Sequence, residues 1–240
     1  MARRRFFVDD VRRGEAVLDG DEAEHLTRVL RAETGQQYEI CDGARLYLGE
    51  IVEAHKHSVR FRIVQELEVA EPAVRVSLLM SLVRFERFEW GIEKATELGA
   101  VRIVPVHADR SQKGLDLAAR KRVERWRKIA RAAGQQSRRV HVPEISPPMA
   151  FREAVEDSAT RRFYLEETPG CPLLLNAILA LPERQRGEAV AVLVGPEGGW
   201  TDRERALLAS AGWVAVSMGP QILRAETAAI AAVAVLVQSW

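Results

Sequence analysis

The sequence predicts an α/β protein with a parallel sheet, preceded by a smaller β-rich domain. Two observations lead to this fold class. After Glu71-Pro72, apolar runs with strand character alternate with amphipathic helical patterns, as they do in parallel sheets. Before that point, short strand-like runs are separated by turn signals, and one short helix pattern interrupts them. We therefore expect a boundary at residue 71, with domains at 1–71 and 72–240.

The composition fits a globular protein without a strong overall charge. Apolar residues make up 47% of the chain, and a formal net charge of +1 gives no global attraction to nucleic acid, so only local basic patches could provide it. Cys41 and Cys171 form no metal or disulfide pattern, which fits a reducing cytoplasm. His55-x-His57 alone is a weak metal pattern, and we expect no metal.

We also expect no membrane association and a cytoplasmic location. The arginines at the start of the chain are followed by an apolar run too short for a signal peptide. The apolar run at 225–240 is alanine-rich, and a membrane span needs ~20 residues of stronger hydrophobicity. We interpret this run as a buried helix.

The first domain is predicted to be a small β-barrel with one short helix. Its strands are expected at residues 5–8, 37–41, 46–54 and 59–64. Asp42-Gly43 is a hairpin turn signal. Asp21 and Glu24 have the spacing of a helix N-cap and its capping-box partner, so a helix is expected from there to residue 31.

Arginines are concentrated in the first domain, with aromatic residues between them, and this pattern suits RNA. A solvated charged face is the alternative that charge alone leaves open, because acidic residues are mixed in. The RNA-binding candidates are Arg3, Arg4, Arg5, Arg12, Arg28 and Arg31, together with Arg110 and Arg139 of the second domain.

The second domain is predicted to alternate strands and helices to the end of the chain. Thr201 and Glu204 form a capping box, Gly99 and Gly212 mark helix ends, and Pro143 should shorten its strand or place it at an edge. The expected strands are 74–83, 101–106, 140–145, 162–166, 189–194 and 213–218. The expected helices are 85–99, 116–133, 149–157, 173–181, 201–212 and 225–240.

Two glycine loops follow the last two predicted strands. The first reads GPEGGW at 195–200, and the second reads MGPQILRAET at 218–227. In open α/β sheets, ligands bind just beyond the C-terminal ends of the strands. We therefore expect the functional site where these two loops meet.

The chemistry of the loops narrows the class of ligand. Glycines let the backbone approach a ligand closely, but neither a phosphate-loop motif nor a dinucleotide motif is present. Glu197 within the first loop would repel phosphate, so a neutral or cationic ligand suits it better. A plain tight turn is the alternative for one loop alone. Two loops at adjacent strand ends favour a site, the second carrying Arg224, Glu226 and Thr227 together.

The paired motifs GPEGGW and MGPQILRAETA resemble the RsmE family of RNA methyltransferases, which belongs to the SPOUT class of knotted α/β enzymes. The segments KATELG at 94–99, HLTRVLR at 25–31 and the RRRFF start extend the resemblance over almost the whole chain. It implies a SPOUT-type knotted parallel sheet with an N-terminal PUA-like β-barrel. It also implies a homodimer that uses S-adenosylmethionine to methylate N3 of a uridine in 16S ribosomal RNA of the small ribosomal subunit.

The reaction that the resemblance implies needs a cation and a base near the uridine. Our hypothesis is that Arg224 or Arg84 stabilises the anionic uridine, that Glu226 takes its proton, and that Thr227 caps the last helix or bonds the base edge. A structural role, accepting backbone N–H groups, is the alternative for Glu226. The expected cofactor contacts are Leu165, Glu166, Val194, Gly195, Glu197, Gly198, Gly199, Met218, Gly219, Ile222 and Leu223.

Three residues depart from the family pattern. Arg84 stands where lysine is usual, Gln135 where glutamate is usual, and Arg138 where glycine is usual. An arginine keeps the charge of a lysine but not its compact shape, so a role that needs an ammonium group is in doubt.

Other functions remain open at this stage. The chain could be a non-catalytic RNA-binding protein, an α/β enzyme for another small ligand, or a SPOUT methyltransferase that acts on a different RNA base.

Overall fold

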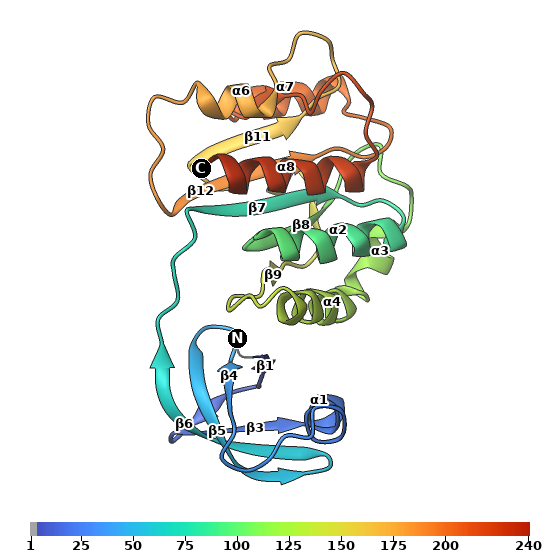
Figure 1. Ribbon diagram of the computed structural model, residues 1–240. Coiled ribbons are helices and arrows are strands. Elements are labelled where there is room, and N and C mark those ends of the chain that lie inside the picture. The colour runs from blue at the N-terminus through green and yellow to red at the C-terminus, as the bar shows by residue number, and fades with distance from the viewer. Residues whose placement is uncertain (1–3) are drawn as a thin grey trace. The chain divides into compact units, whose positions relative to one another are not determined.

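The computed structural model describes residues 4–240, which divide into two compact units (Figure 1). The first unit holds the chain up to Ala70 and the segment Gly134–Val142. The second unit holds Glu71–Ala133 and Pro143–Trp240.

A single boundary at residue 71 does not describe the segment Gly134–Val142, which returns to the first unit. Val140 belongs to a buried apolar cluster with Phe7, Cys41 and Leu46. The Cys41 thiol donates a hydrogen bond to the Val140 carbonyl at 3.2 Å. These contacts join residues about a hundred positions apart in the sequence, so no local sequence pattern could predict them.

The first unit is a six-stranded sheet with two buried apolar clusters. Its order is β1-β4-β5-β6-β3-β2, and every pairing is antiparallel except that of β1 with β4. Phe6, Ile40, Ile51 and Phe61 share one buried cluster across the sheet. The strands are β1 (Arg5–Phe7), β2 (Val11–Arg12), β3 (Glu15–Asp19), β4 (Gln37–Cys41), β5 (Leu46–His55) and β6 (Ser58–Leu67).

The short helix of this unit begins earlier than the sequence predicts. Asp19, not Asp21, is the N-cap of α1 (Gly20–Glu24), because β3 ends at Asp19 and the helix follows it directly. The Asp19 side chain makes no capping hydrogen bond. The chain then widens into a π-helical turn, His25–Val29. The predicted turn at Asp42 is confirmed, since the Asp42 carboxylate accepts hydrogen bonds from the backbone N–H groups of Ala44 and Arg45.

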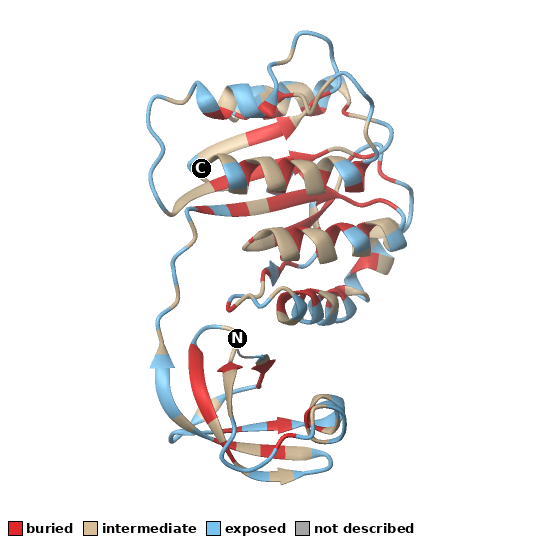
Figure 2. Ribbon diagram, viewed as in Figure 1, coloured by how far each residue is buried: buried red, intermediate tan, exposed pale blue. Residues whose placement is uncertain are grey.

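The second unit contains a sheet in which all pairs are parallel, as predicted (Figure 1). Its order is β10-β8-β7-β12-β11-β13, and β9 pairs with β8. Figure 2 shows that β7 and β12 at its centre are largely buried, which explains their nearly continuous apolar sequence. The strands are β7 (Val74–Ser81), β8 (Arg102–His107), β9 (Glu144–Ile145), β10 (Met149–Ala150), β11 (Arg161–Leu165), β12 (Glu188–Val194) and β13 (Val214–Val216).

Helices cover both faces of this sheet (Figure 1). Helix α8 packs on β7 and β12 and contacts α2 and α6, while α5 and α7 contribute to an apolar cluster with the strands on the other face. The bounds are α2 (Phe85–Leu98), α3 (Leu115–Arg120), α4 (Val123–Gln136), α5 (Phe151–Val155), α6 (Leu174–Leu179), α7 (Asp202–Ser210) and α8 (Ala225–Ser239).

Three predicted elements of this unit need correction. The helix expected at 116–133 is two helices, because α3 closes at Lys121 and α4 starts anew to place Trp126 against Phe85 and Phe88. The strand expected at 140–145 is reduced to β9, since its first residues belong to the other unit. The helix expected at 149–157 starts as β10, which pairs with β8.

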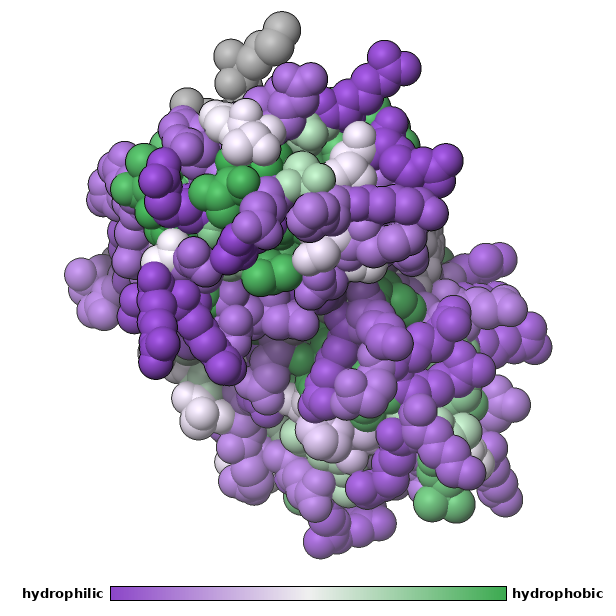
Figure 3. Space-filling model, turned by 90° about the horizontal axis from the view of Figure 1, so that it is seen from below, coloured by the Kyte–Doolittle hydropathy of each residue, from purple (hydrophilic) through white to green (hydrophobic). Residues whose placement is uncertain are grey.

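Both cysteines are free thiols. No helix within residues 4–240 has the length and apolar character to cross a membrane. In the same range, no group of three or more His, Cys, Asp or Glu side chains is arranged to hold a metal ion. The face in Figure 3 is dominated by hydrophilic side chains, with small hydrophobic patches between them.

Candidate active site

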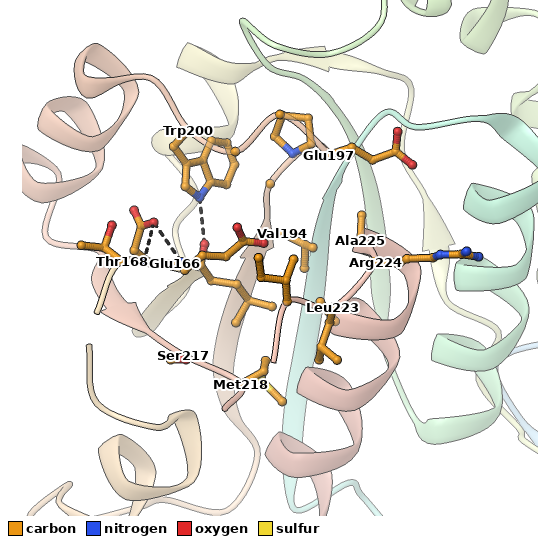
Figure 4. A pocket seen from close by; sticks show the side chains of 18 of the residues that line it. Glu166, Thr168, Val194, Glu197, Trp200, Ser217, Met218, Leu223, Arg224 and Ala225 are labelled. Atoms are coloured by element: carbon orange, nitrogen blue, oxygen red, sulfur yellow. Dashed lines mark hydrogen bonds between the residues drawn. The ribbon is translucent and has the colours of Figure 1, made fainter. Parts of the chain in front are cut away.

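A cavity of about 630 Å³ lies at the C-terminal ends of β11, β12 and β13 and reaches the start of α8 (Figure 4). Arg110 and Arg224 line it, whereas Arg84, Glu226 and Thr227 do not. Every residue expected to contact a cofactor lines it: Leu165, Glu166, Val194, Gly195, Glu197, Gly198, Gly199, Met218, Gly219, Ile222 and Leu223.

The first glycine loop is shaped by the buried ring of Trp200. The indole Nε1 donates a hydrogen bond to the Leu165 carbonyl at 2.8 Å, which ties the loop to the end of β11 (Figure 4). A Cβ at Gly195 would lie 3.0 Å from the indole ring, so only glycine fits there without a shift. Gly199 has φ +67°, a conformation that side chains disfavour.

The second loop, after β13, is held at its start by the Ser217 side chain, whose hydroxyl donates to the Gly219 carbonyl at 3.1 Å. Gly219 has φ +132°, and its N–H donates to the Ser217 hydroxyl at 3.2 Å. Ile222 is 81% exposed although it lines the cavity. Arg224 is the exposed N-cap residue of α8, and its side chain makes no capping hydrogen bond.

Glu166 is a buried carboxylate with a full set of partners. Arg205 Nε lies 2.6 Å from one carboxylate oxygen, and the backbone N–H groups of Glu167 and Thr168 donate to the other at 2.9 and 3.2 Å. Burial raises the pKa of Glu166, but the Arg205 ion pair and the backbone hydrogen bonds outweigh it and hold that pKa below its ordinary value. The carboxylate is therefore ionised and fixed in place.

Glu226 is buried more deeply than Glu166 and has fewer partners. It is 3% exposed; its Oε1 lies 3.7 Å from Arg87 Nε, and its Oε2 has no hydrogen-bond partner among the described residues. Arg87 also pairs with Glu197 of the first loop, whose side chain is directed to the same side as Arg224 in Figure 4.

Arg87 therefore connects α2 to both loops, although no sequence motif marks it as a site residue. Its partner Glu197 is 110 positions away, so no local spacing could have indicated the contact.

Glu204 has a second function that its capping-box spacing does not reveal. It caps α7 with Thr201, as predicted, since the Thr201 hydroxyl accepts from the Glu204 N–H and Glu204 accepts from the Thr201 N–H at 2.8 Å. It also accepts from the Asp109 N–H at 2.8 Å, although it is only 1% exposed. This bond fixes the chain beside Arg110, which donates to the Gly198 carbonyl at 2.8 Å.

The residues predicted to bind RNA differ in burial and in whether they form ion pairs. Arg5, Arg12 and Arg28 form ion pairs with Glu39, Asp10 and Glu24. Arg4 and Arg31 are exposed. Arg139 is half-buried, and burial lowers its pKa. Arg110 is separate from these, at the cavity of the second unit, and Arg3 lies outside the described residues.

The departures from the family pattern have distinct structural settings. Arg84 is the exposed N-cap of α2 and lies outside the cavity lining. Gln135 lies in the last turn of α4, and its carbonyl accepts from the Arg138 N–H at 3.1 Å. Arg138 has φ +57°, the left-handed conformation for which glycine is the usual residue.

Comparison with family models and known proteins agrees with this arrangement. Residues 70–237 match the RNA methyltransferase domain, and residues 18–64 match the RNA methyltransferase PUA domain. The chain is 35% identical over 237 residues to the ribosomal RNA small subunit methyltransferase E of Mycobacterium bovis, covering 94% of this chain and 88% of that protein. It is 31% identical over 229 residues to the protein of that name from Bacillus subtilis, covering 91% and 88%.

Solved structures give the same result. The Neisseria gonorrhoeae ribosomal RNA small subunit methyltransferase E, bound to S-adenosyl methionine, aligns with a TM-score of 0.83 at 28% identity over 99% of this chain and 98% of that one. A putative methyltransferase from Legionella pneumophila, in complex with the same cofactor, aligns with a TM-score of 0.81 at 28% identity, covering 98% and 97%. The chain therefore belongs to the ribosomal RNA small subunit methyltransferase E family of RNA methyltransferases.

Proposed function

We propose that this protein transfers the methyl group of S-adenosylmethionine to N3 of a uridine in 16S ribosomal RNA. The observation that carries the proposal is the cavity between the two glycine loops, in a chain of this methyltransferase family. The target base and the nucleic acid come from the family resemblance, and the cavity supports the cofactor.

The chemistry of the cavity fits a cationic sulfonium compound. Its loops expose backbone and glycine surface without a phosphate-binding motif, and the carboxylates of Glu166 and Glu197 are at its lining. Leu223 and Ile222 would hold the adenine, while backbone groups of Gly195, Gly199 and Met218 would hold the polar parts. When bound, S-adenosylmethionine supplies an electrophilic methyl group.

The chain's own residues must prepare the uridine. N3 of uridine is mostly protonated at neutral pH, so it must lose its proton before it can act as a nucleophile. Arg224 at the cavity edge places a guanidinium where it can stabilise the resulting anion. Arg84, the exposed N-cap of α2, is the alternative for this role; like Glu226 and Thr227, it does not line the cavity. Thr227 is exposed in the first turn of α8, where it can reach an entering base edge.

Glu226 is our candidate for the proton acceptor, because its Oε2 has no partner among the described residues and is free to accept a proton. Its burial favours a second candidate role, in which the carboxylate only positions the start of α8. Replacement by glutamine separates the two. As the base, Glu226→Gln should lower turnover by roughly 10²–10⁴-fold with cofactor affinity intact, whereas unchanged turnover would rule the role out.

We further propose that the second unit carries the SPOUT trefoil knot, that the protein is a homodimer, and that it works in the cytoplasm on the small ribosomal subunit. The apolar surface of α8 supports the dimer, since Ala228, Ala231, Ala234 and Val235 are only half-buried in the single chain. Light scattering at micromolar concentration should give the mass of two chains. A monomer would contradict the dimer.

Methyl transfer from labelled S-adenosylmethionine tests the main proposal. Small ribosomal subunits from cells that lack this protein, and naked RNA from the same cells, would serve as acceptors, and mass spectrometry would identify the modified nucleotide. N3-methyluridine is the expected product. Label on another base would assign a different reaction of the same class. RNA binding by a protein that does not bind S-adenosylmethionine would favour a non-catalytic RNA-binding protein.

A further inference from the structure

Three arginines of the first unit have a backbone conformation that arginine disfavours. Arg13, Arg31 and Arg138 have φ values of +52°, +51° and +57° and are the non-glycine residues with positive φ in the part of the chain described. The left-handed region brings Cβ close to the carbonyl oxygen, so a single such residue is strained, and glycine is the usual occupant.

The turns at these positions are held by backbone hydrogen bonds and do not depend on the arginine side chains. Beside Arg13, the Gly14 carbonyl accepts from the Ile63 N–H at 2.7 Å. After Arg31, the Ala32 N–H donates to the Leu26 carbonyl at 3.1 Å. A glycine would therefore make the same turns with less strain.

At Arg138 the backbone also forms the contacts. Its N–H donates to the Gln135 carbonyl, and its carbonyl accepts from the Arg5 guanidinium. The guanidinium of Arg138 itself has no ion pair or hydrogen bond within residues 4–240, and the same holds for Arg13 and Arg31. All three side chains are exposed.

Most other arginines of this unit are already neutralised. Six of them form ion pairs with carboxylates: Arg5, Arg12, Arg28, Arg45, Arg60 and Arg62. Arg13, Arg31 and Arg138 thus differ from most arginines of the first unit, because they form no ion pair within the described residues.

We propose that Arg13, Arg31 and Arg138 contact phosphate groups of the substrate RNA. The strain at each turn is retained because the turn presents a free guanidinium, which matches phosphate oxygens in a bidentate fashion. RNA is a continuous polyanion, so three separate turns can engage one molecule. The inference rests on the proposed function for the identity of the RNA. The sequence analysis also selected Arg31 as an RNA-binding candidate, but it selected the ion-paired Arg12 and Arg28 and neither Arg13 nor Arg138.

Glycine substitutions separate binding from folding. The triple variant Arg13→Gly, Arg31→Gly, Arg138→Gly should fold with a Tm equal to or up to about 4 °C above that of the wild type, because strain is relieved. Its affinity for small ribosomal subunits that lack the methylation should fall by at least roughly tenfold at about 0.1 M salt. The slope of log affinity against log salt should become shallower by about 2, since each lost phosphate contact removes ~0.7.

The triple variant Arg45→Gln, Arg60→Gln, Arg62→Gln is the matched control, because it removes the same number of charges. These three arginines are paired with carboxylates, so their loss should leave affinity and salt slope close to those of the wild type. Unchanged affinity and slope in the triple glycine variant would overturn the proposal, as would an equal loss in the control, which would mean that only total charge matters. A Tm well below that of the wild type would also overturn it, because the arginines would then hold the turns.

Methylation of the same subunits by the wild-type protein is measured in parallel. If the wild type binds them without methylating N3 of uridine, the proposed reaction fails, and the affinity data still decide whether the three arginines contact RNA.

Discussion

The two buried carboxylates near the cavity, Glu166 and Glu226, differ in how many hydrogen-bond and ion-pair partners the fold gives them. Glu166 follows β11 and has an arginine and two backbone N–H groups as close partners. Glu226, at the start of α8, has one ion pair at 3.7 Å and one oxygen with no described partner. A buried charge without partners is costly, so it persists only where something else offsets the cost.

The difference assigns the two carboxylates different purposes. Glu166 is bonded on both oxygens, which suits a carboxylate that shapes the cavity wall. Glu226 has spare accepting capacity, which suits a carboxylate that completes its bonding with a substrate or with another ordered group. Substitutions at the partners of each carboxylate should therefore have different effects.

Removing the partner of Glu166 should destabilise the fold strongly. In Arg205→Gln, the buried Glu166 carboxylate loses its ion pair, and the free energy of unfolding should fall by about 3 kcal/mol. Urea denaturation measures this change. Arg203→Gln on the same helix is the control, since Arg203 is exposed and has no ion pair within the described residues. Equal losses of stability in the two variants would show that the Arg205–Glu166 ion pair contributes no more than an unpaired surface arginine.

The wall beside Glu166 should also depend on the Trp200 hydrogen bond. Trp200→Phe deletes the bond to the Leu165 carbonyl, and it should cost about 2 kcal/mol of stability and weaken S-adenosylmethionine binding. Trp213→Phe is a matched change, because Trp213 Nε1 donates to the Val155 carbonyl at 2.9 Å but does not line the cavity. It should cost similar stability and leave the cofactor affinity, measured by calorimetry, unchanged.

Breaking the single ion pair of Glu226 should affect turnover more than stability. Arg87→Gln should lower kcat about tenfold, which corresponds to about 1.4 kcal/mol, while Arg87→Lys should restore part of it. Arg125→Gln on the neighbouring helix α4 removes an ion pair with Glu89 instead and should leave kcat unchanged. If Arg87→Gln keeps full turnover, Glu226 does not need its partner.

Acid should reveal the low pKa of Glu166 as a small effect on stability. A carboxylate whose pKa is lowered by folding stabilises the protein above its unfolded-state pKa, about 4.3, and this contribution is lost as the pH falls through the lower folded-state value. The stability difference between wild type and Glu166→Gln should thus be constant above about pH 5 and shrink below about pH 4. Urea denaturation of the two proteins across this pH range measures the trend, and a difference that stays constant below about pH 4 would contradict it.

The sequence predicted those parts of the molecule that depend on neighbours in the chain. The capping box of Thr201 and Glu204, the helix end at Gly99 and the two glycine loops are all local patterns, and the structure contains them. The expected cofactor contacts could be named because they lie within short motifs at strand ends.

Contacts between distant residues could not be predicted in this way. The Arg87–Glu197 pair and the Cys41–Val140 hydrogen bond join segments that only the finished fold brings together. Charge counting also failed to separate paired from unpaired arginines, because a carboxylate partner such as Glu39 of Arg5 sits on a neighbouring strand.

The central pairing of the larger sheet has a consequence for synthesis of the protein. β7 lies beside β12, with Val74 opposite Glu188, and α8 packs on both strands although it is made after them. On the ribosome, β7 must therefore wait, with one edge and one apolar face uncovered, until most of the second unit has been translated. Such delayed long-range pairing slows folding and exposes the nascent chain to aggregation, so we expect this unit to depend more on chaperones than the locally paired first unit.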